Sequence, residues 1–158
     1  MSRESKDQTI GRLIAAYRAS TSQESAFDAL AAARLGIGLT DLRCLDLIQS
    51  RGGLTAGELA TASGLTTGAV TAVTDRLERA GLARRVRDAS DRRKVNLEVT
   101  DRHYERSETI WGPLMRDWQQ TLAQRFSATE LATIVTFLET VTDLAARHGE
   151  RIREDTAA

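Results

Sequence analysis

Apolar residues recur at helical spacing over most of this chain and divide it into segments. Residues three, four and seven positions apart share one face of a helix, so this spacing predicts amphipathic helices. The segments that show it cover residues 7–33, 40–49, 55–62, 66–80 and 101–125, followed by a last one from about 128 to 147. The pattern therefore predicts a mainly α-helical protein.

One short region departs from helical spacing. Val95, Leu97 and Val99 alternate with polar residues, which is the period of a strand with one buried face. Residues 84–86 form a second strand-like run, and the charged residues 88–93 lie between the two. We therefore expect a small β-hairpin.

The helices predicted over 55–62 and 66–80 are joined by a turn at Gly64. Gly81 ends the second helix, as glycine commonly does at helix C-termini. The hairpin follows at once. Two short helices with a wing-like hairpin are the arrangement that places one helix in the major groove of DNA.

The distribution of charge supports a nucleic-acid interface at this place. The whole chain has a net charge of zero, but residues 76–94 carry eight basic and three acidic side chains, a local net charge of +5. A local basic footprint on a neutral protein is typical of a specific DNA reader.

On the helix predicted over 66–80, one face is made of small, hydroxyl-bearing and basic residues. Thr67 and Thr71 are suited to base edges, and the small residues let the backbone approach them. Arginines further along are better placed for phosphates. The residues of this segment that we expect to contact DNA are Thr66, Thr67, Gly68, Thr71, Ala72, Arg76 and Arg79. The plainer alternative is a packed helix pair with an ordinary solvent-facing surface.

At the hairpin tip, Arg92 and Arg93 follow Asp91. A guanidinium can enter the narrow minor groove, and a neighbouring carboxylate can fix its direction. A solvated charged turn is the alternative, but directly after a helix-turn-helix the DNA interpretation is favoured.

These residues resemble the multiple-antibiotic-resistance regulator (MarR) family of winged helix-turn-helix transcription factors. The resemblance covers about residues 35 to 101, and two departures are Ala72, where many members have arginine, and Arg102 to Tyr104, where many have glycine. The matching positions are Leu59-Ala60, Gly64-Leu65, Val70-Thr71, Asp75-Arg76-Leu77-Glu78, Gly81-Leu82, Arg85, Asp91-Arg92-Arg93 and 97–100.

The resemblance implies a homodimer on double-stranded DNA, with recognition helices in adjacent major grooves and Arg93, oriented by Asp91, in the minor groove. It assigns residues 1–35 to an N-terminal dimerisation helix, 36–100 to the DNA-binding domain and 101–158 to C-terminal dimerisation helices. The function expected is transcriptional repression at a palindromic promoter site. A small aromatic or lipophilic effector that relieves repression is also implied.

Two other functions stay open from the residues alone. One is a winged-helix module that binds protein, and the other is a redox regulator that uses Cys44, the single cysteine. Cys44 lies among leucines, which favours a small core residue instead. Tyr17, Phe27, Trp111 and Met115 are candidates for an effector cleft, although aromatic stripes at helical spacing usually form core or interface.

Several classes of protein are not expected. No nucleophile elbow, phosphate loop or zinc-protease motif occurs, so we predict no enzyme and no cofactor. His103, read as a surface or helix-start residue, and His148 have no metal-ligand cluster beside them. No apolar run approaches the ~18 residues of a membrane span, and the N-terminus has no signal-like segment, which predicts a cytoplasmic protein.

Overall fold

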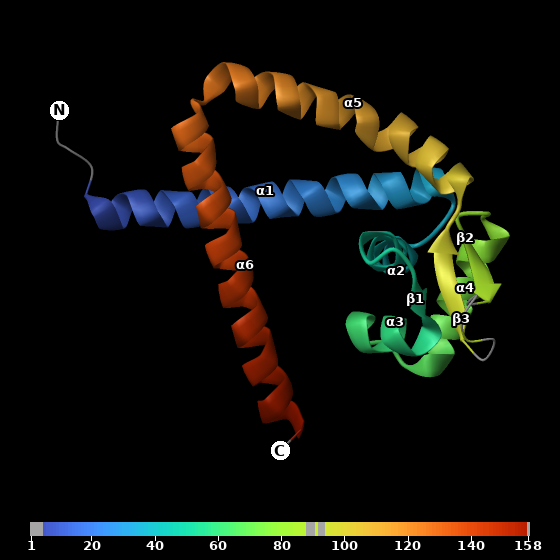
Figure 1. Cartoon of the computed structure of the whole chain (residues 1–158). Helices are drawn as coiled ribbons and strands as arrows, with labels where there is room; N and C mark the ends of the chain where they lie inside the picture. Colours follow the sequence, from blue (N-terminus) through green and yellow to red (C-terminus); the bar gives the residue numbers. More distant parts are fainter. Residues whose placement is uncertain (1–4, 88–90, 92–93, 158) are drawn as a thin grey trace. The chain divides into compact units, whose positions relative to one another are not determined.

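The computed structural model describes residues 5–87, 91 and 94–157, with side chains as far as residue 155. Within them it contains helices and three short strands (Figure 1). Their bounds are α1 (Lys6–Leu35), α2 (Leu39–Ser50), β1 (Leu54–Thr55), α3 (Ala56–Ser63), α4 (Thr67–Arg79), β2 (Ala83–Arg87), β3 (Val95–Val99), α5 (Asp101–Arg125) and α6 (Ala128–Ala157). The mainly α-helical prediction with a small hairpin is confirmed.

The chain divides into two compact units, Met1–Ile110 and Trp111–Ala158. The first holds α1 to α4, the sheet and the start of α5. The second holds the rest of α5 and all of α6. None of the described helices is long and apolar enough to cross a membrane.

The three strands of the first unit form an antiparallel sheet in the order β1-β3-β2. In the hairpin, Ala83 pairs with Val99 and Arg87 with Val95, while Leu54 of β1 pairs with Leu97. Strand β1 was not predicted, because two residues are too few to show an alternating pattern. It fixes the start of α3 against the hairpin.

The core of the first unit is built from the apolar stripes of its short helices. Leu45 and Ile48 of α2, Leu59 of α3 and Leu77 of α4 are fully buried, together with Leu82 after α4. Each such side chain contributes roughly 1.5–3 kcal/mol by leaving water. The apolar stripe of α4, which includes Val70, Val73 and Leu77, is therefore its core face, and the opposite face is exposed.

Two glycines set the direction of α4. Gly64 ends α3 with φ of 72°, and Gly81 follows α4 with φ of 70°. At Gly81 the N–H of Leu82 donates to the Leu77 carbonyl at 2.9 Å, which closes the helix end. The left-handed conformation suits glycine, since a Cβ strains it. The turn at Gly64 sets the direction in which α4 begins, and the turn at Gly81 leads from the end of α4 into the hairpin.

His103 differs from its expected surface position. It lies near the start of α5, as expected, but its side chain is only 2% exposed. Its Nε2 lies 2.7 Å from Gln49 Oε1 and its Nδ1 3.3 Å from Ser107 Oγ. Burial lowers its pKa below the usual value. Sequence spacing missed this because the partner, Gln49, is on a different helix.

The long helices carry many exposed apolar residues. In α1, Ile10, Leu13 and Ile14 are 44 to 54% exposed. In the second unit the large exposed apolar residues are Met115, Trp118 and Leu122 of α5, Phe126 directly after it, and Val135, Leu138, Leu144 and Ile152 of α6. Helix α6 begins at a capping box, in which the Ser127 N–H donates to Glu130 and the Glu130 N–H donates to Ser127 Oγ.

Candidate nucleic-acid interface

Helix α4 presents the residues predicted to contact DNA together on its exposed side. The side chain of Thr66, the N-cap residue, accepts a hydrogen bond from the Ala69 N–H at 3.3 Å and so caps the start of the helix. The exposed residues of this face are Thr66, Thr67, Gly68, Thr71, Ala72, Asp75, Arg76 and Arg79. The helix N-terminus adds a partial positive charge where the side chains are smallest.

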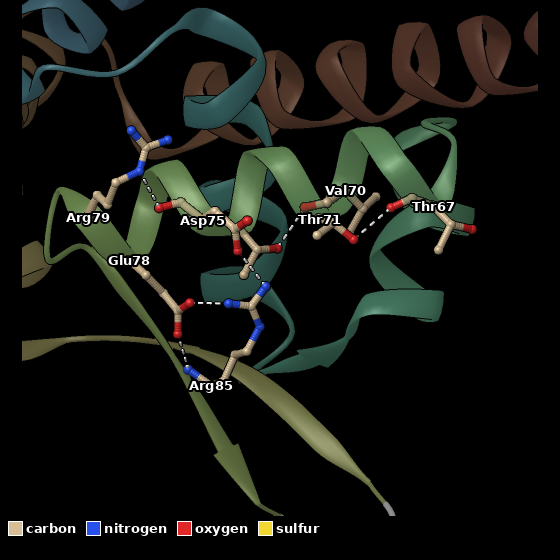
Figure 2. A network of polar contacts seen from close by, with 8 residues as sticks. Thr67, Val70, Thr71, Asp75, Glu78, Arg79 and Arg85 are labelled. Atoms are coloured by element: carbon tan, nitrogen blue, oxygen red, sulfur yellow. Dashed lines mark hydrogen bonds and ion pairs between the residues drawn. The ribbon is translucent and has the colours of Figure 1, made fainter.

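Two of these side chains are held by the helix itself, as Figure 2 shows. The Thr71 hydroxyl donates to the Thr67 carbonyl at 3.1 Å, and Arg79 Nε donates to the Asp75 carbonyl at 3.1 Å. With its proton used internally, Thr71 presents to a base an acceptor oxygen and a methyl group. Such a surface suits an amino-group donor or a thymine methyl.

Arg85 ties the hairpin to α4. Its Nη2 donates to Asp75 Oδ1 at 2.9 Å, its Nη1 donates to Glu78, and its backbone N–H donates to Glu78 Oε1 at 3.0 Å (Figure 2). The hydrogen bond to Asp75 is the main cause that raises the pKa of Arg85. We call Arg85, Asp75 and Glu78 the clasp. Sequence reasoning did not find it, although acids three apart on α4 were a signal.

Arg76, expected at a phosphate, is paired within the protein. Its Nη2 lies 2.6 Å from Oδ1 of Asp41, a residue of α2 that is almost fully buried. The Arg76 side chain is still 44% exposed. A phosphate contact from this side chain stays a prediction. If it forms, it is made by a guanidinium that Asp41 already binds on its other side.

The hairpin tip is described only in part. The Asp91 carbonyl accepts a hydrogen bond from the Lys94 N–H at 2.9 Å. Arg92 and Arg93 lie outside the described residues. Next to the tip, Arg84 Nη2 donates to Glu98 Oε2 at 3.3 Å across the hairpin.

Comparison with known proteins supports this geometry. The MarR family model matches residues 37–95, which span α2 to the start of β3. The HTH-type transcriptional regulator YcgE of Bacillus subtilis (strain 168) is 34% identical over 128 residues, 81% of this chain and 82% of that protein. The chain belongs to the MarR family.

Solved MarR structures agree in fold. Wild-type MarR from E. coli in its apo form is 25% identical, covers 83% of this chain and 95% of its own, and has a TM-score of 0.55. A MarR family protein from Bacillus stearothermophilus is 22% identical with a TM-score of 0.67, over 90% of this chain and 99% of its own. The resemblance and the winged helix-turn-helix fold are thus confirmed, and the protein is a MarR-family transcriptional regulator.

The residues of this MarR-family protein that are candidates for effector binding are divided between the two units. Phe27 lines a cavity of about 250 Å³ in the first unit, together with Leu30, Ala31, Arg34, Thr109 and Ile110. Tyr17 of α1 is half-buried and does not line it. Trp111 and Met115 belong to the second unit.

A larger cavity that sequence reasoning did not anticipate lies between α2 and α3. Its volume is about 550 Å³, and its lining includes Cys44, Leu47, Ala62 and Leu65. Cys44 is 1% exposed. Burial, and next the charge of Asp41, raise the pKa of its thiol, which disfavours the reactive thiolate. The geometry of this MarR-family protein therefore favours the core interpretation of Cys44 over the redox one.

Proposed function

We propose that this MarR-family regulator acts as a homodimer that represses transcription by binding a palindromic promoter site in double-stranded DNA. The observation that carries the proposal is the exposed face of α4. Small and hydroxyl-bearing residues lie at its N-terminal end, arginines follow, and a basic hairpin is fixed to it by the clasp. This combination provides close backbone approach, base contacts and phosphate contacts on one surface.

The long helices support the dimer. Exposed apolar residues at helical spacing on α1, α5 and α6 are costly in water and stable when a second surface covers them. Most closed oligomers are two-fold symmetric, and two α4 helices related by such an axis match a palindrome. We therefore assign dimerisation to residues 1–35 and 101–158, and DNA binding to 36–100. The Phe27 cavity is the candidate site for a small aromatic or lipophilic effector.

The test is binding of the purified protein to the DNA upstream of its own gene. Fluorescence anisotropy is titrated over several salt concentrations, with a shuffled fragment of equal length as the nonspecific reference. For wild-type protein we expect log affinity to fall with log salt by roughly 0.9 for each phosphate neutralised. Arg93→Ala should lower both affinity and slope.

Arg147→Ala is the matched control, since it removes the same charge from an exposed polar position of α6 outside the proposed DNA-binding surface. Its affinity and slope should equal those of the wild type. If no fragment in a genome-wide selection binds better than shuffled DNA, the DNA-binding proposal fails, and a protein-binding winged helix takes its place.

A further inference from the structure

We propose that Asp41 is a positioning residue for DNA binding, which holds the Arg76 guanidinium of α4 so that its outer nitrogen meets one phosphate. The inference rests on the proposed function and deepens it. Asp41 itself touches no DNA in this proposal, because it is buried beneath the side chain that does.

The geometry of the pair is bidentate. Arg76 Nε lies 3.1 Å from Asp41 Oδ1 and 3.0 Å from Oδ2, while Nη2 lies 2.6 Å from Oδ1. Nη1 of Arg76 makes no hydrogen bond within the described part of the chain. The carboxylate side chain is 3% exposed and the arginine side chain 44% exposed. One edge of the guanidinium is thus anchored, and the nitrogen outside that edge is available to solvent or a phosphate.

Asp41 is well fixed to serve as an anchor. Its Oδ2 accepts the Gly38 N–H at 3.1 Å, which caps the start of α2. Burial alone would raise its pKa, but the hydrogen bonds from Arg76 and the Gly38 N–H outweigh burial and hold the pKa below its usual value. Asp41 therefore stays ionised, and a buried carboxylate without its partner is strongly disfavoured. Arg76 cannot leave it to follow a distant phosphate.

Two consequences follow for recognition. Asp41 occupies the edge of the Arg76 guanidinium that carries Nε and Nη2. In this proposal the remaining nitrogen, Nη1, binds a phosphate, and phosphate contacts carry no sequence information, so Arg76 should add affinity without sequence preference. A flexible arginine loses rotamer freedom when it binds, whereas one held in place has already lost it on folding. The anchored side chain therefore binds phosphate at a lower entropic cost.

This proposal makes a prediction opposite to that of simple charge counting. Removal of an acid beside a DNA-binding surface should strengthen binding if only net charge matters. If Asp41 positions Arg76, Asp41→Asn should weaken operator binding by about tenfold, the size of one charge-assisted hydrogen bond. Arg76→Gln should cause a similar loss and reduce the salt slope by roughly 1.8, which is about 0.9 for the one phosphate met by each protomer of the dimer.

The experiment measures anisotropy against salt for wild type, Asp41→Asn, Arg76→Gln and the double variant. If the pair acts as a unit, the double variant binds no worse than Arg76→Gln alone. The ratio of operator to shuffled-DNA affinity should be unchanged in all of them. Glu98→Gln is the matched control: it also removes a carboxylate paired with an arginine, Arg84, but on the hairpin surface. Its affinity should stay equal to wild type or rise.

Circular dichroism on each variant separates a folding defect from a binding defect. Should Asp41→Asn not fold, Arg76→Lys gives the answer, because lysine keeps the charge but lacks the planar fork. It should keep the salt slope and lose affinity. A folded Asp41→Asn that binds as tightly as wild type, or an Arg76→Lys of wild-type affinity, overturns the inference alone. Wild-type protein without salt-dependent DNA affinity overturns the inference and the proposed function together.

Discussion

The short helices of the first unit and the long helices show the same apolar spacing but opposite burial. Leu45, Leu59 and Leu77 are fully buried. Ile14 of α1 is 54% exposed and Leu138 of α6 45% exposed. The short helices close on one another because they cross around a common centre with the sheet. The long helices expose apolar stripes, which the proposed dimer would cover. The same apolar spacing thus predicts that a segment is an amphipathic helix, but it does not predict which surface covers the apolar face of that helix.

The largest expected effect is a loss of stability in the core formed by the short helices of the first unit. Leu45→Ala leaves a cavity where α2 packs against its neighbours, and such changes cost about 2–5 kcal/mol of unfolding free energy. Urea denaturation followed by circular dichroism measures the loss, which should be the same at low and high protein concentration. A loss that disappears at high concentration would mean that this core, too, depends on a second chain.

The next effect concerns the exposed stripes. Leu138→Glu places a charge on the apolar face of α6 and should shift the protein from dimer to monomer in size-exclusion chromatography with light scattering. Glu139→Ala, next along the same helix, is the control and should remain dimeric. The isolated monomer should retain its helical circular dichroism signal. A variant that stays dimeric would show that α6 does not supply the interface.

The smallest effect tests His103, which joins α5 to α2. Because burial lowers its pKa below 6.5, the folded protein favours the neutral ring. Its contribution is complete above pH 6.5 and is lost as pH falls toward the lowered pKa, since the unfolded chain takes up the proton first. His103→Asn should therefore flatten the stability profile on the acid side of pH 6.5, measured by urea midpoints. Parallel profiles would contradict a lowered pKa.

The sequence predicted the elements of this protein better than its polar contacts. Apolar spacing and glycines located α4 to within a residue or so, because that information is local. Strand β1 was missed, since only its pairing with Leu97 makes it a strand. The anchoring of Arg76 by Asp41 was also missed, because the two residues lie far apart along the chain and meet only when α2 packs on α4. Trp111 and Met115 belong to a different unit from Phe27, and their place in one effector cleft stays a prediction.

The clasp has a consequence for how this protein can change over evolution. Asp75, Glu78 and Arg85 bind one another through opposite charges, so they should co-vary among relatives as a set. Among the residues that the structure describes, the Thr71 hydroxyl bonds only to the backbone carbonyl of Thr67, so the side chains of Thr67 and Thr71 are free to vary singly. Under the proposed function, operator preference can therefore diverge between descendants one substitution at a time, while the hairpin keeps its place beside α4.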